Sequence, residues 1–158
     1  MATPAKAKAK ENILADNRKA FHEYEILEKI ESGIVLTGPE VKSTRGRQMN
    51  LKAGYASIEN GQVILKGVHI APYKPANEQH YNPDRFRTLL LSHKEIAALD
   101  KQLKPGGITL IPLQTHLNAR GKIKILIGVC KGKKTYDKRQ DLKKKAQNLE
   151  INRAMKRY

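Results

Sequence analysis

Apolar and polar side chains alternate from Tyr24 to Glu31, with Ile26 and Ile30 on the same side as Tyr24. A period of two residues indicates a β-strand with one face towards a core. We expect Ser32-Gly33 to turn the chain into a second strand at residues 34–36. The sequence therefore begins its folded part with two short strands.

Two hairpins are predicted further along the chain. Asn60-Gly61 separates the alternating segments 55–58 and 62–70, and this dipeptide suits a tight turn because both residues tolerate positive φ. A second pair of strands covers residues 108–117 and 122–130.

In the last of these strands the alternation separates a core side from a solvent side. Lys122 and Lys124 fall on the outward side, with Leu126 after them, opposite a set of apolar residues predicted to face the core: Ile123, Ile125, Ile127 and Val129. Two basic side chains are thus expected to point away from the core.

Two helices complete the pattern. A short helix is predicted over residues 40–45, since Pro39 suits a first helical turn and Gly46 an end. A longer one opens with the capping box of residues 92–95 and presents one apolar face, made of Ile96, Leu99 and Leu103. The proline-rich segment 72–86 is predicted to be a long loop.

These elements predict a mainly β fold. We expect a small antiparallel, OB-like β-barrel of about six strands, with two to three helices on its rim and a basic C-terminal tail. The chain divides into a disordered arm (1–12), the barrel (13–130) and the tail (131–158).

Positive charge is concentrated in that tail. The chain carries a formal net charge of +16. Between residues 131 and 158 eleven Lys and Arg face three Asp and Glu, which leaves half of the net charge in 28 residues. Mutual repulsion resists compaction of such a block and favours an external polyanion. Tyr136 lies inside the cluster and could stack on a base.

The composition argues against several other classes of protein. Cys130 is the single cysteine, which excludes an intrachain disulfide and fits a reducing cytoplasm. The longest apolar run near it, residues 125–127, is far below the ~20 residues of a membrane span. The N-terminus lacks the apolar core of an export signal. We expect a soluble cytoplasmic protein.

The sequence contains no catalytic signature. The five histidines are scattered, so no metal site and no cofactor is expected. Glu31 and Glu40 are interpreted as surface charges beside Lys29 and Lys42 rather than as an acid–base pair. We predict that the chain is not an enzyme.

The tail has weak helical potential. It carries only a thin apolar stripe, and three adjacent lysines at 143–145 repel one another. We expect the segment 131–158 to be disordered when free and helical when bound along RNA on the ribosome.

Several stretches of the sequence together resemble the SmpB family, bacterial proteins that bind SsrA RNA, also called transfer-messenger RNA (tmRNA). They are Asn17-Arg18-Lys19-Ala20 with His22 and Tyr24; residues 37–43; Asn50-Leu51-Lys52 to Tyr55-Ala56; residues 69–73; residues 85–91; and Gly132-Lys133-Lys134 with Asp137-Lys138-Arg139. They follow the family's order over nearly the whole chain.

The resemblance implies the function of an adaptor in trans-translation. The barrel would bind the tRNA-like domain of tmRNA in place of a missing anticodon arm, and the tail would enter the decoding centre and the empty message channel of stalled ribosomes. The implied partners are tmRNA and small-subunit ribosomal RNA, with elongation factor Tu and alanyl-tRNA synthetase acting on the same RNA. The protein would be a monomer in this complex, without a membrane partner.

The resemblance also implies the binding residues. The tmRNA face would contain Glu31, Leu90 and Lys124, with neighbours Asn17, Arg18, His22, Tyr24, Glu40, Lys42 and Arg45. Leu90 has an equal alternative as a core residue. The ribosome would contact Lys131, Gly132, Lys133, Lys134, Tyr136, Asp137, Lys138 and Arg139. Thr88 stands where the family usually has Lys, so one phosphate contact is expected to be missing.

Two alternatives remain at this point. A structural ribosomal protein would have the same charge and the same small barrel. A peripheral membrane protein could use the basic tail, although its apolar stripe is narrower than interfacial helices need.

Overall fold

A computed structural model describes residues 12–133 and 135–156, with the side chains of 135–137 left out. The predicted arm therefore lies outside the described residues except for Asn12. The element order is β1 (Ile13–Asp16), α2 (Arg18–Glu23), β2 (Tyr24–Ile34), α3 (Gly38–Arg45), β3 (Met49–Asn50), β4 (Tyr55–Glu59), β5 (Gln62–Lys66), β6 (His69–Ile70), the 3₁₀ turn η1 (Lys74–Ala76), β7 (Arg87–Leu90), α4 (His93–Leu103), β8 (Ile108–Leu117), β9 (Ile123–Gly132) and α5 (Thr135–Met155).

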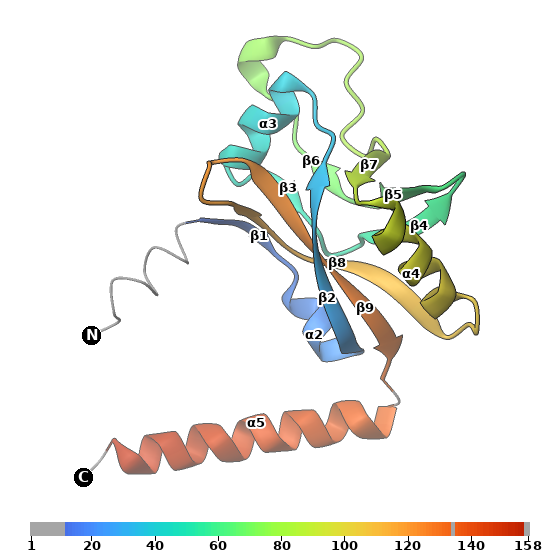
Figure 1. Cartoon of the computed structure of the whole chain (residues 1–158). Helices are drawn as coiled ribbons and strands as arrows, with labels where there is room; N and C mark the ends of the chain where they lie inside the picture. Colours follow the sequence, from blue (N-terminus) through green and yellow to red (C-terminus); the bar gives the residue numbers. More distant parts are fainter. Residues whose placement is uncertain (1–11, 134, 157–158) are drawn as a thin grey trace.

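Six strands form a closed antiparallel ring (Figure 1). Its order is β8-β4-β5-β7-β2-β9, and β9 returns to β8. β1 adds to the free side of β8, and β3 pairs with β6 in a separate small sheet. A ring without open edges is the arrangement expected of a small barrel. The predicted mainly β, antiparallel fold with helices on its rim is confirmed.

The main hydrophobic core fills the ring. It includes Val63, Leu65, Leu110, Ile125 and Ile127, each at most 1% exposed. Leu99 of α4 closes one end, with Ile96 and Leu103 half-buried beside it. The predicted apolar face of this helix is thus the face that packs, and the capping box of Ser92 and Glu95 starts it as expected.

A second, smaller core lies outside the ring, beneath α2. Ala20 packs there with Ile111, Leu113 and Cys130, and Tyr24, Ile26 and Leu126 lie at its margin. Because α2 covers this part of the outer face, β9 is apolar on both sides at its C-terminal end. Cys130 is a buried strand residue in this second core.

Strand boundaries differ from the predicted ones in β2, β5, β6 and β9. β2 continues through Ser32 and Gly33 as one strand, so the predicted turn there is wrong. The predicted strand 62–70 is split into β5 and β6 at Gly67, whose φ is +71°. β9 extends through Gly132, two residues past its expected end at residue 130.

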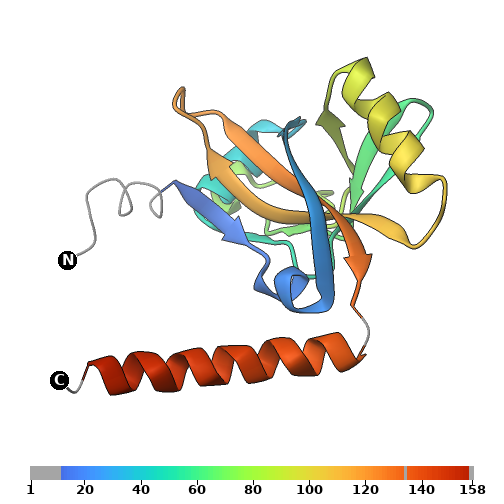
Figure 2. The same cartoon turned by 60° about the horizontal axis from the view of Figure 1, so that its bottom comes forward.

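Helix α5 leaves the barrel where β9 ends and runs past α2 (Figures 1 and 2). Most of its apolar side chains are exposed, including Leu142, Leu149 and Met155. Within the described residues, Asp141 near the start of the helix pairs with Lys133 at the end of the barrel. Most of the helix is therefore not supported by packing on the core.

Candidate nucleic-acid interface

One row of residues crosses four neighbouring strands on the outer face of the ring. Gly33 of β2 lies opposite Leu90 of β7 on one side and Lys124 of β9 on the other. Lys124 in turn lies opposite His116 of β8. Residues paired in this way point to the same face of a sheet. α2 covers the lower half of this outer face, so the row lies on the half that is open to solvent.

Leu90 is 59% exposed, so its alternative interpretation as a core residue is wrong. It leans over Gly33, where an added Cβ would approach the Leu90 Cβ to 3.1 Å. The missing side chain at position 33 therefore lets Leu90 lie low across the face. Lys124 is half-buried beside it, pointing outward as the alternation predicted.

Glu31 shares this face, since it lies opposite Leu126, two residues along β9 from Lys124. Its carboxylate is exposed and accepts from the ring of His116, with 3.0 Å between Nε2 and Oε2. The three residues that the family resemblance implies for the tmRNA face, Glu31, Leu90 and Lys124, are thus neighbours on one surface.

Next to this row is a hollow of about 440 Å³. Its floor is apolar, from Ile34, Leu36, Val41, Leu90 and Ile123, and four cations stand around it: Arg45, Arg120, Lys122 and Lys124. Arg45 ties α3 to the β8–β9 turn by donating from Nη2 to the Gly121 carbonyl at 3.2 Å. An apolar floor with cations at its rim can hold an unstacked base while its phosphates meet the rim. We call this hollow and the row beside it the basic face.

The other predicted contacts lie at the opposite end of β2. Arg18 and His22 are on α2, and Tyr24 is the first residue of the strand. Seven residues separate Tyr24 from Glu31, about 23 Å at 3.3 Å per residue. The predicted face is therefore divided into two surfaces. One is the basic face, and the other, the lower surface, is formed by Arg18, His22 and Tyr24. Lys42 is exposed on α3 and does not belong to the group of Arg18, His22 and Tyr24.

Asn17 has an internal role. Its side chain is buried, accepts from the Ala20 amide to cap α2, and donates to the carbonyls of Leu51 and Pro112 at 3.2 and 2.9 Å. These bonds fasten α2 to the barrel. Asn17 thus positions the lower surface, and its own polar atoms are already used within the protein.

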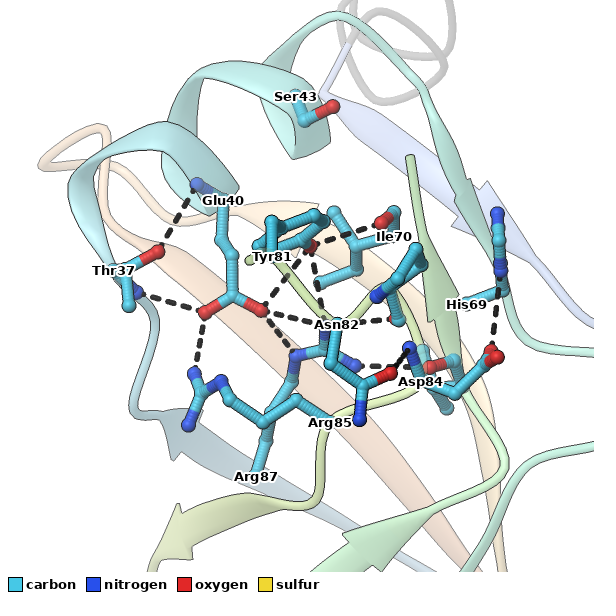
Figure 3. A network of polar contacts seen from close by, with 12 residues as sticks. Thr37, Glu40, Ser43, His69, Ile70, Tyr81, Asn82, Asp84, Arg85 and Arg87 are labelled. Carbon is cyan, nitrogen blue, oxygen red and sulfur yellow. Dashed lines mark hydrogen bonds and ion pairs between the residues drawn. The ribbon is translucent and has the colours of Figure 1, made fainter. Parts of the chain in front are cut away.

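Glu40 is the centre of a buried ionic network (Figure 3). Its side chain is 0% exposed, so its interpretation as a surface charge is wrong. One carboxylate oxygen pairs with Arg85, and the other accepts from Nε of Arg87 at 2.6 Å. Arg87 is itself fully buried and also donates to the carbonyls of Val68 and Pro83 at 2.9 and 3.0 Å.

The network holds the Glu40 carboxylate in its charged form. Burial alone would raise its pKa, but hydrogen bonds from Arg85, from the Thr37 backbone amide and from Arg87 outweigh burial, so the pKa is lowered. The same carboxylate closes a capping box with Thr37 at the start of α3. Glu40 therefore joins α3 to β7, the two elements that supply Arg45 and Leu90 to the basic face.

The start of the tail is fastened to the barrel. Lys131 and Gly132 belong to β9 and pair with Glu25 and Tyr24. The Lys133 amide donates to the Glu23 carbonyl at 3.0 Å, and its ammonium group contacts the Phe21 carbonyl and pairs with Asp141 of α5. This pair lowers the pKa of Asp141.

Of the remaining predicted ribosome contacts, Lys138 and Arg139 lie on α5. Lys134 and the side chains of Tyr136 and Asp137 lie outside the described residues.

Comparison with known proteins gives matches over most of the chain. The family model described as SmpB protein matches residues 14–157. The chain belongs to the SmpB protein family. A relative from Streptococcus mutans named SsrA-binding protein is 50% identical over 151 residues, covering 96% of this chain and 97% of the relative. An SsrA-binding protein of Ligilactobacillus salivarius is 47% identical over 154 residues, or 98% and 99% of the two chains.

A solved structure also matches this member of the SmpB family. It is described as "tmRNA-SmpB: a journey to the center of the bacterial ribosome" and aligns with a TM-score of 0.64 at 41% identity. The alignment covers 76% of this chain and 84% of the solved one. Since SmpB relatives are named for what they bind rather than for a reaction, the prediction that the chain is not an enzyme is confirmed.

Sequence reasoning did not assign three residues to the basic face: His116, Arg120 and Lys122. Lys122 was placed outward by alternation, but its position beside α3 depends on the barrel closing. His116 joins the face only through the register of β8 with β9. A pattern along one strand carries no such information.

Among residues 12–133 and 135–156, no three His, Cys, Asp or Glu side chains are arranged to hold a metal ion. In the same part of the chain no helix has the length and hydrophobicity to cross a bilayer.

Proposed function

We propose that this chain is an RNA-binding adaptor of trans-translation. It binds the tRNA-like domain of tmRNA through the basic face and delivers it to stalled ribosomes. The observation that carries the proposal is the row of Leu90, Gly33 and Lys124 with Glu31 beside it, because the register unites residues that are far apart in the sequence.

The chemistry of the basic face fits a folded RNA better than a plain duplex. Cations at the rim provide phosphate contacts, while the apolar floor provides a surface for a base that is out of its stack. Bases of this kind occur in the loops of tRNA-like folds. Glu31 adds an acceptor for a base amino group or a 2′-hydroxyl.

The tail is assigned to the ribosome, while Arg18, His22 and Tyr24 at the other end of β2 stay proposed contacts of tmRNA. α5 projects from the end of the barrel opposite the basic face and carries Lys138, Arg139 and the lysines 143–145. In this proposal it follows the empty message channel, and Tyr136 stacks in the decoding centre. The name tmRNA-SmpB of the matched structure supports this assembly. Elongation factor Tu and alanyl-tRNA synthetase act through the same RNA.

The test is the identity of the RNA that co-purifies with the full chain from bacterial cells. An adaptor should enrich tmRNA strongly over ribosomal RNA, in amounts well below those of ribosomes. A variant with Leu90→Asp and Lys124→Glu should lose this enrichment, while Lys101→Glu on the exposed side of α4 should keep it.

The same experiment decides against the main alternative. A structural ribosomal protein would bring down the RNA of one subunit in equal amounts, with or without tmRNA in the cell. That result would overturn the proposed function.

A further inference from the structure

The side chain of His116 is 19% exposed and reaches across β9 to Glu31. Its Nε2 lies 3.0 Å from Oε2 of the carboxylate. A carboxylate only accepts hydrogen bonds, so the ring must carry its proton on Nε2 at this contact. The contact therefore fixes both the orientation of the ring and one oxygen of Glu31.

Glu31 is out of place for simple phosphate binding. The neighbouring hollow of the basic face is lined by cations, among them Lys124, Lys122 and Arg120, and the chain as a whole carries +16. A carboxylate in this position repels phosphates. It helps RNA binding only where it meets a hydrogen-bond donor, such as the N–H edge of a base or a 2′-hydroxyl.

The geometry leaves one oxygen ready for that contact. His116 occupies Oε2, and none of the described residues donates a hydrogen bond to Oε1. The carboxylate is 53% exposed, so Oε1 is open to an incoming ligand. Leu90 and Lys124 lie close by across β2 and β9, where they can contact the same nucleotide.

We propose that His116 is a positioning residue for RNA recognition, which holds Glu31 so that its free oxygen accepts from the donor edge of an unstacked base. This inference rests on the proposed function and adds a residue and a chemical selectivity to it. A mobile glutamate side chain loses rotamer entropy when a ligand immobilises it. A side chain that is already held in place loses much less. His116 thus supplies part of the affinity without touching the RNA.

The experiment measures binding of the full chain to a transcript of the tRNA-like domain by fluorescence anisotropy. We expect His116→Ala to weaken binding about fivefold, because the freed Glu31 side chain must then be immobilised when RNA binds. His116→Gln should restore most of the affinity, because the amide nitrogen of Gln can take the place of Nε2. In a chain that already carries Glu31→Ala, removing His116 should have no further effect.

Matched controls separate positioning from folding. His93→Ala removes an exposed histidine from α4 and should leave the affinity unchanged. Each variant should keep the thermal midpoint of the unsubstituted chain. If Glu31→Ala weakens binding while His116→Ala stays within about twofold of the unsubstituted chain, the role of His116 is refuted. Additive losses in the double variant refute it as well. If the unsubstituted chain does not bind the transcript, the proposed function itself fails.

Discussion

At the scale of single residues, Glu40 shows that a residue named for RNA contact can act by building the surface. Its carboxylate is shared by Arg85 and Arg87, which follow it by 45 and 47 residues. The sequence offers no sign of such pairing, because Glu40 lies two residues from Lys42 and resembles a surface charge. Only the closed barrel brings β7 beneath α3.

We predict that Glu40→Gln destabilises the fold by about 3–5 kcal/mol, because it leaves the buried Arg87 without its counter-charge. Urea denaturation measures this free energy of unfolding. Glu59→Gln is the matched control, since Glu59 pairs with Lys66 at the surface and should change stability far less. Equal effects of the two substitutions would refute the structural role of Glu40.

The lowered pKa of Glu40 predicts a dependence of stability on pH. In the unfolded chain this carboxyl group has its ordinary pKa of 4.5, and in the folded chain a lower one. Its contribution is therefore complete above pH 4.5 and is lost as the pH falls through the folded-state pKa. Unfolding curves between pH 3 and pH 7 should show a weaker acid dependence for Glu40→Gln than for the unsubstituted chain. Equal dependence of stability on pH in the two chains would argue against a stabilising charge on Glu40.

Lys124 is the cation at the centre of the basic face. We expect Lys124→Ala to weaken binding of the tRNA-like transcript and to reduce the slope of log K against log salt by about one, the loss of one phosphate contact. Lys101→Ala on α4 should leave the slope unchanged. An unaltered slope for Lys124→Ala would place the RNA elsewhere.

At the scale of elements, the confirmed predictions are those in which a few adjacent residues determine the local conformation. Asn60 and Gly61 both adopt positive φ, at 51° and 72°, and form the predicted hairpin. Ser92 and Glu95 cap α4 in the predicted manner. In both cases the chemistry that decides the structure lies within four residues.

The predicted turn at Ser32-Gly33 failed for a reason that lies outside the segment. Glycine after serine is typical of turns, but Gly33 is extended within β2 and its missing side chain accommodates Leu90 of β7. Helix α2 was missed because it has six residues, of which only Ala20 is buried. Tertiary contacts decide both elements, and these contacts also create the two surfaces.

The tail helix is predicted to depend on its surroundings. The isolated peptide 131–158 should give a largely disordered circular dichroism spectrum in dilute buffer, because its adjacent lysines repel and its apolar stripe has no partner. Adding single-stranded RNA should raise its helicity, while adding the same amount of an uncharged polymer should not. A stable helix in buffer alone would contradict the expectation of folding on binding.

At the scale of the whole molecule, the barrel separates two basic regions. The basic face lies where β2 ends, and the tail departs where β2 begins, at the opposite end of the same strand (Figure 1). β2 is paired with β9 along most of its length and with β7 at its end, which makes it a rigid spacer. The molecule is therefore built to hold one RNA at one end while the tail reaches a second RNA at the other.

The most direct test of this division uses a reconstituted translation system stalled on a message without a stop codon. The full chain is compared with a version that ends at Gly132, which keeps both hydrophobic cores. The account predicts that the shortened chain binds tmRNA with the affinity of the full chain but fails to support tagging of the stalled peptide. Equal tagging by the two chains would contradict it.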